Sequence, residues 1–101
     1  MKKLSMVVHT SLQQELADLL RSLQLDSFMF SPIEEHSSQL EHDPFLSARD
    51  RVVGYVPKVR VDVILEDDRA RTLLGEIRNS GVSFKGKGIY WINEVEEAGE
   101  L

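Results

Sequence analysis

The chain has 101 residues, of which 42% are hydrophobic and 29% charged, with no cysteine and a formal net charge of −5. These values are typical of one globular domain over residues 1–101, and they exclude disulfides, thiolate metal sites and cysteine nucleophiles. The negative charge argues against nucleic acid as the partner. No apolar run approaches the ~20 residues of a membrane span, and no signal peptide is recognisable, so we expect a cytoplasmic protein without membrane insertion.

The first half of the chain predicts a strand, a helix and a second strand. Residues 3–9 alternate between two faces, as a strand does. Ser11 and Gln14 have the spacing of a capping box, and the helix that follows has one apolar face, formed by Leu12, Leu16, Leu19, Leu20 and Leu23. Residues 27–33 predict the second strand. Residues 34–48 lose all periodicity and predict a long loop, and loops of this length are usually functional or mobile.

The second half predicts another strand, a helix and a last strand. Residues 59–65 alternate as a half-buried strand does, and Pro57 belongs at its entrance, at an edge or at a bulge. Asp67 and Asp68 offer an N-cap for the second helix, whose apolar stripe is formed by Ala70, Leu73, Leu74 and Ile77. Gly81 is a candidate left-handed residue at its end. Residues 89–95 predict the fourth strand.

This order of elements predicts an α+β fold. Two strand-helix-strand halves give a ferredoxin-like βαββαβ domain, with a four-stranded antiparallel sheet and both helices on one of its faces. The other face stays uncovered unless another chain covers it, and Ile64, Tyr90 and Ile92 are our candidates for that face. Tyr90 and Trp91 are consecutive strand residues, so they point to opposite faces.

The third predicted strand carries a resemblance to a known family. Residues 56–64, Val-Pro-Lys-Val-Arg-Val-Asp-Val-Ile, and the continuation Glu-Asp-Asp-Arg-Ala at 66–70 resemble the PII signal-transduction family. The chain also looks like a smaller bacterial PII-like family, domain of unknown function 3240, through its loop at 34–48 and its Gly-Ile-Tyr-Trp-Ile ending at 88–92. The resemblance implies a homotrimer whose sheets face inward, with ligand clefts between the subunits.

The same resemblance suggests where a ligand binds. Lys58 matches a PII lysine that contacts an effector carboxylate, and an ammonium suits an anion chemically. Lys85, Gly86 and Lys87 stand near the family's phosphate loop, without its aspartate. Glutamates at 94, 96 and 97 stand where PII proteins have arginines that hold nucleotide phosphates. Carboxylates at these positions would repel a triphosphate, so the cofactor stays unknown.

Each candidate site has an ordinary alternative. Lys58 could instead be a solvated charge at a strand end, and Lys85, Gly86 and Lys87 could be a flexible connector rather than an anion-binding turn. His36 and His42, together with nearby carboxylates, could bind a divalent metal ion or be ordinary exposed histidines.

Three functions remain open at this point. The first is a trimeric PII-like regulatory or sensor protein that binds a small anion or metal ion between subunits and presents residues 34–48 to a protein partner. The second is a CutA-like metal-binding protein that uses His36 and His42, and the third is a non-catalytic interaction module. No serine, histidine and acid have a spacing that suggests a triad, so we expect no enzymatic activity.

Overall fold

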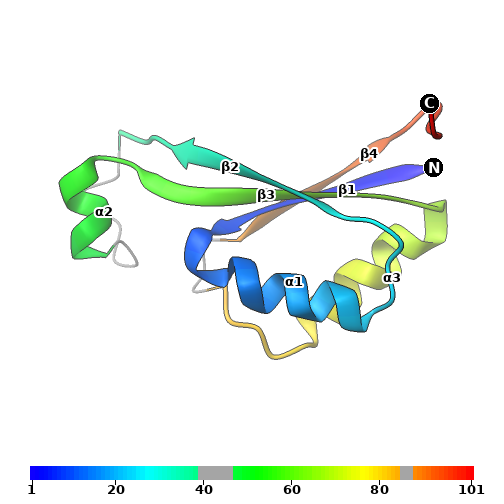
Figure 1. The fold of residues 1–101 in the computed structure, drawn as a ribbon, viewed down its shortest axis with the longest axis horizontal. Coiled ribbons are helices and arrows are strands. Elements are labelled where there is room, and N and C mark those ends of the chain that lie inside the picture. Colours follow the sequence, from blue (N-terminus) through cyan, green and yellow to red (C-terminus); the bar gives the residue numbers. More distant parts are fainter. Residues whose placement is uncertain (39–46, 85–87) are drawn as a thin grey trace.

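A four-stranded antiparallel sheet with two long helices on one face forms the domain (Figure 1). The structure is a computed structural model, and it describes residues 1–38, 47–84 and 88–101. The strand order is β2-β3-β1-β4, which confirms the predicted ferredoxin-like fold. The elements are β1 (Lys2–His9), the 3-10 turn η1 (Thr10–Leu12), α1 (Gln13–Ser22), β2 (Met29–Glu35), α2 (Ala48–Val53), β3 (Val56–Leu65), α3 (Asp67–Arg78) and β4 (Ile89–Glu94).

The core lies between the sheet and the helices α1 and α3. Alternate residues of the central strands face the helices, since Leu4 pairs with Val63 and Val8 with Val59 across β1 and β3. The predicted helical stripes are buried against them, and the buried cluster includes Met6, Leu12, Leu16, Leu20, Val61, Leu73, Leu74 and Ile77. Each such side chain contributes roughly 1.5–3 kcal/mol through its removal from water. This packing fixes which sheet face is left open.

The pairing of β4 with β1 corrects the prediction of which residues lie on the open face. Tyr90 pairs with Met6 and Ile92 with Leu4, and both partners point toward the helices. Tyr90 and Ile92 therefore lie on the helix side, where Ile92 packs against the core. The open face instead receives Trp91, which confirms that neighbouring aromatic residues point to opposite faces.

The residues that cap the N-termini of the helices differ from those predicted. The Nδ1 atom of His9 accepts a hydrogen bond from the backbone N–H of Ser11 at 3.1 Å, so His9 caps the η1 turn. The helix α1 then begins without a side-chain cap, and the predicted capping box is absent. In α3 the N-cap residue is Glu66, and Asp67 and Asp68 lie in the first turn, where they complement the positive end of the helix.

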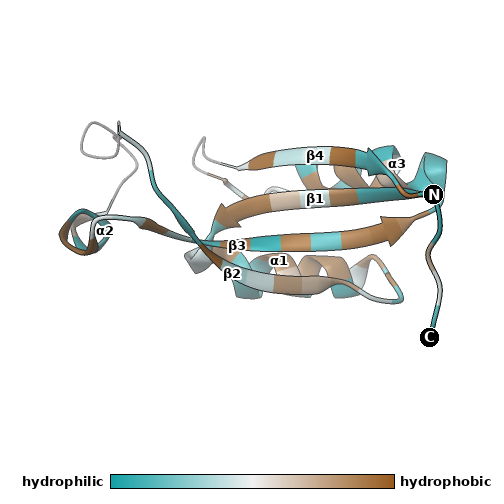
Figure 2. Cartoon of the chain, turned by 90° about the horizontal axis from the view of Figure 1, so that it is seen from above, coloured by the Kyte–Doolittle hydropathy of each residue, from teal (hydrophilic) through white to brown (hydrophobic). Residues whose placement is uncertain are grey.

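The stretch predicted as one loop, residues 34–48, contains more regular structure than the sequence suggested. Glu34 and Glu35 belong to β2, and a short helix, α2, begins at Ala48. Ser47 caps this helix by accepting from the N–H of Asp50, and Gly54 ends it with a left-handed φ of 83°. We call α2 and the strand ends beside it, residues 34–36 and 55–57, the arm. The arm extends beyond the end of β1 (Figures 1 and 2).

Figure 2 views the sheet from the face that α1 and α3 leave open. Four hydrophobic side chains of this face, among the described strands, are well exposed: Trp91 at 37%, Ile64 at 39%, Met29 at 53% and Ile89 at 55%. The chain after β4 runs past one end of this face, and the N–H of Val95 donates to the carbonyl of Met1 at 2.9 Å. Within the described ranges, no helix has the length and apolar character needed to cross a bilayer.

Candidate functional site at the base of the arm

A histidine and an aspartate join the end of β1 to the arm. The Nε2 atom of His9 lies 2.9 Å from Oδ2 of Asp50 in α2. Because Nδ1 of the same ring accepts the backbone N–H of Ser11, the hydrogen-bond network places the ring proton of neutral His9 on Nε2, which donates to Asp50. The hydroxyl of Ser11 also lies 3.0 Å from Nδ1. The imidazole thus ties the η1 turn and α2 to one strand end.

Asp50 is a buried carboxylate that the local structure keeps ionised. Its side chain is 4% exposed. Burial opposes its charge, but the hydrogen bonds of His9 and Ser47 outweigh that effect and lower the pKa of Asp50 below its ordinary value of 3.8. The capped helix therefore presents its acid to His9 in the charged form.

Lys58 lies beside this pair on the neighbouring strand. It is the register partner of His9 across β1 and β3, and its side chain is 3% exposed. Its Nζ atom is 3.8 Å from Oε1 of Glu35 at the end of β2, a residue whose side chain is 40% exposed. A buried lysine is uncommon unless a carboxylate accompanies it. An ammonium, a histidine and two carboxylates thus meet where the arm leaves the sheet, and we call His9, Glu35, Asp50 and Lys58 the arm-base cluster.

The other predicted site residues are not part of the arm-base cluster. His36 is exposed, with Nε2 3.1 Å from Oε1 of Glu34 and its ring centre 5.7 Å from that of Tyr55. His42, Lys85, Gly86 and Lys87 lie outside the described residues. Among the residues that are described, no three histidine or acidic side chains come close enough to hold a metal ion.

A second polar group lies at the centre of the open sheet face. The hydroxyl of Ser5 donates to Oδ1 of Asp62 at 2.6 Å, and Nε of Arg60 donates to Oδ2 at 3.0 Å. Both Ser5 and Asp62 are buried although they face away from the helices. Both oxygens of the Asp62 carboxylate therefore have partners, and this polar group is largely removed from water within the single chain.

Sequence reasoning missed Asp50, Ser47 and His9 as members of one cluster. The spacing of Ser47 and Asp50, followed by Gly54, is the signature of a short capped helix and could have indicated α2. The contact between His9 and Asp50 joins residues 41 positions apart, and no local pattern predicts it.

The ferredoxin-like domain, with an arm between its second and third strands and Lys58 at the base of that arm, agrees with the resemblance of residues 56–70 to PII proteins. The chain belongs to the family described as "Protein of unknown function (DUF3240)", whose family model matches residues 1–101. Two curated proteins named "Nitrogen regulatory protein P-II" are similar to it. The one from Rhizobium meliloti is 26% identical over 98 residues, which cover 96% of this chain and 88% of the relative.

The second such protein, from Mesorhizobium japonicum, is 24% identical over 98 residues, with the same coverage of 96% and 88%. Among solved structures, a DUF3240 family protein from Shewanella baltica OS155 superposes with a TM-score of 0.70. That superposition covers 99% of this chain and 94% of the other, at 16% identity. At this identity the superposition shows a shared fold and nothing about a ligand.

Proposed function

We propose that this chain is a regulatory or sensor protein of the PII-like kind, which binds a small anionic ligand at clefts between subunits of a cytoplasmic homotrimer. Residues 34–48 would carry the signal to a protein partner. The relatives named nitrogen regulatory proteins support the regulatory class. We propose no reaction. Ser11, His9 and Asp50 are linked by hydrogen bonds, as the residues of a catalytic triad are. However, Nδ1 of His9 accepts the backbone N–H of Ser11 and so caps the η1 turn, which is a structural use of the ring.

The observation that carries this proposal is the position of Lys58 at the base of the arm. Its partner Glu35 is 3.8 Å away, beyond hydrogen-bond distance, and is partly exposed. A ligand carboxylate or phosphate could therefore replace Glu35 beside the ammonium without leaving a buried charge unpaired. Release of Glu35 would remove the contact between Lys58 and the end of β2, which pairs with the start of β3 and so belongs to the arm. Ligand binding would thus act on the arm through Glu35.

The open face supports the proposed oligomer. Trp91 and Ile89 present apolar surface around the buried pair of Ser5 and Asp62. A domain of this size buries only roughly 65% of the surface of its unfolded chain, so sister subunits are an available source of further burial. Three copies meeting through this face would place their strand edges against one another and form the clefts that the proposed ligand occupies.

A metal site is the second candidate. It would use His36 and His42, and the exposed imidazole of His36 beside the carboxylate of Glu34 is the observation in its favour. Two histidines from each of several subunits could complete a coordination shell that one chain lacks.

Titration calorimetry on the full chain separates these candidates. ATP, a small dicarboxylate, Zn²⁺, Cu²⁺ and Ni²⁺ are the probes. The anion-binding proposal predicts heat with an anion and at least a ten-fold loss of affinity in Lys58→Met, because the ammonium is removed while the apolar stem remains. The matched control, Arg49→Met, removes an exposed cation of the same arm and should bind as the unaltered chain does.

The remaining outcomes are equally distinct. Heat with a metal ion alone, lost in the double variant His36→Ala and His42→Ala, would replace the anion proposal by the metal site. Anion binding that Lys58→Met leaves unchanged would remove Lys58 from the site. The absence of binding heat with every probe would overturn both candidates and leave a non-catalytic interaction module.

A further inference from the structure

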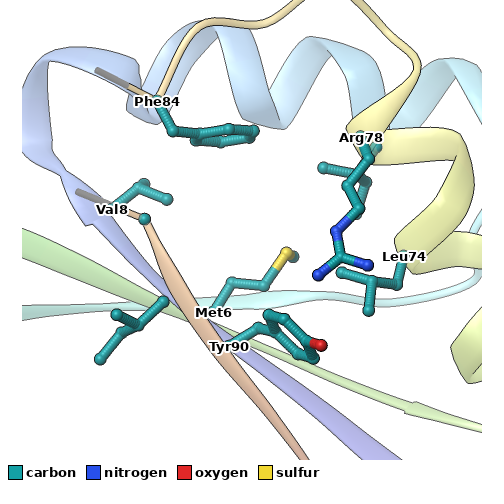
Figure 3. A pocket seen from close by; sticks show the side chains of 9 residues that line it. Met6, Val8, Leu74, Arg78, Phe84 and Tyr90 are labelled. Atoms are coloured by element: carbon teal, nitrogen blue, oxygen red, sulfur yellow. The ribbon is translucent and has the colours of Figure 1, made fainter. Parts of the chain in front are cut away.

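A cavity on the helix side of the sheet lies between α3, β1 and β4 (Figure 3). Its walls are apolar, and they are formed by Met6, Val8, Leu74 and Ile77. The ring of Phe84 faces the cavity from one side, and the guanidinium of Arg78 reaches in from the other, above the ring of Tyr90. The site thus combines an apolar interior with aromatic rings and one cation.

We infer that this cavity binds a small carboxylate with a single aromatic ring, its ring among the apolar side chains and its carboxylate on Arg78. Such sites are typically apolar with a few polar groups that fix the orientation of the ligand. The interior would receive the ring, and the guanidinium at the mouth would receive the charge.

The size of the cavity suits one ring. Its volume is about 150 Å³, and an apolar protein cavity of about this volume binds benzene. Phe84 and Tyr90 add aromatic edges and faces, with which a ligand ring can form offset or edge-to-face contacts. Two fused rings would exceed this space unless the walls moved, whereas a short aliphatic acid would leave part of it empty.

The charge of the site selects an acid over a neutral ring. The guanidinium carbon of Arg78 lies 4.8 Å from the ring centre of Tyr90, which holds the planar cation in place. Some of the other arginines are paired with carboxylates, for example Arg60 with Asp62 and Arg69 with Glu76. Arg78 has no such pair among the residues that the structure describes, so both of its outer nitrogens can take a carboxylate in bidentate fashion.

This site does not depend on the proposed function. Met6 and Val8 point to the helix side of β1, whereas His9 and the open face lie on the other side. Binding here neither uses Lys58 nor needs a second subunit. Failure of one proposal would therefore leave the other standing.

Sodium phenylacetate is a suitable probe, because it has one ring and one carboxylate, and 2-phenylethanol is its neutral counterpart. Titration of the methyl-labelled full chain, followed by NMR, reads the methyl signals of Val8, Leu74 and Ile77 directly. We expect saturable shifts with half-saturation near or below about 1 mM, which a ligand of this size can reach. The neutral alcohol should bind at least about ten-fold more weakly, because it cannot use the cation.

Two variants decide the role of the cation. Arg78→Gln should weaken phenylacetate about ten-fold and leave 2-phenylethanol unchanged, whereas Arg71→Gln, which alters an exposed arginine of the same helix, should change neither. Both variants keep the apolar walls, and the methyl spectrum itself reports whether they fold. The inference is overturned if phenylacetate shifts none of these methyls up to about ten-fold above the expected half-saturation. Equal binding of the acid and the alcohol, or unchanged binding of the acid in Arg78→Gln, would overturn it as well.

Discussion

The Nε2 atom of His9 lies 2.9 Å from Oδ2 of Asp50, and this contact links the last residue of β1 to the short helix of the arm. A helix of six residues is too short to persist in water on its own. The contact with His9, together with the Ser47 cap and Gly54, accounts for why α2 forms here. The position of α2 relative to the sheet therefore depends on polar contacts such as that of Asp50 with His9.

Replacement of Asp50 should release α2. In Asp50→Ala the hydrogen bonds from His9 and Ser47 to the side chain are lost, and the free energy of unfolding should fall by about 1–3 kcal/mol. Amide exchange over residues 48–53 should accelerate more than exchange in the core strands. Hydrogen exchange followed by mass spectrometry measures this, with Asp26→Ala, the loss of an exposed carboxylate, as the control. Unchanged exchange in α2 would show that another contact holds the arm.

The free energy of unfolding should depend on pH through the ionisation of Asp50. Since folding lowers the pKa of Asp50 below 3.8, its carboxylate stabilises the folded state fully above its unfolded pKa. That contribution is lost as the pH falls through the lower, folded pKa. The free energy of unfolding, measured by urea denaturation between pH 6 and pH 3, should therefore fall with acid.

Asp67 adds to the same trend, because the hydrogen bond from the terminal amine of Met1 lowers the pKa of its carboxyl. The decrease should be smaller in Asp50→Ala than in the unaltered chain, since the variant lacks one of these two carboxylates. Equal decreases in both proteins would mean that Asp50 is not held ionised by folding.

Two glycines should respond oppositely to the same substitution. Gly54 has a φ of 83° at the end of α2, a conformation that costs a residue with a side chain about 1–2 kcal/mol, so Gly54→Ala should destabilise the chain. Gly75 lies inside α3, and an added Cβ would meet nothing within 4 Å. Gly75→Ala should therefore stabilise by about 0.5–1 kcal/mol. Thermal unfolding of the pair tests this, and a stabilising Gly54→Ala would contradict the assigned backbone.

Local patterns in the sequence were sufficient for the strands and the long helices. The alternation at 59–65 predicted a strand, found at Val56–Leu65 with Pro57 at its entrance. Leu16 and Leu20 of α1 and the stripe of α3 are buried as expected, and Leu19 is partly buried. The prediction that Tyr90 and Ile92 lie on the open face was wrong, because alternation shows only that neighbouring residues point to opposite faces of the sheet. The pairing with β1 decides which set faces the helices.

The arm-base cluster was only partly predictable. Lys58 stood out through its place in a recognisable stretch of sequence, but its burial and its partner Glu35 depend on how β2 and β3 pair. The helix α2 is too short for a period of 3.6 residues to show, so only its caps could have indicated it. His36 was identified as a candidate, and its role at a metal site stays a prediction.

The most direct test is the mass of the particle in solution, measured by gel filtration with light scattering. The account predicts three times the chain mass of 11.5 kDa. It also predicts that Trp91→Glu, which places a charge on the open face, gives a folded single chain, whereas Val52→Glu on the exposed surface of α2 keeps the larger particle. A single chain of 11.5 kDa for the unaltered protein would contradict the proposed trimer and the clefts between its subunits.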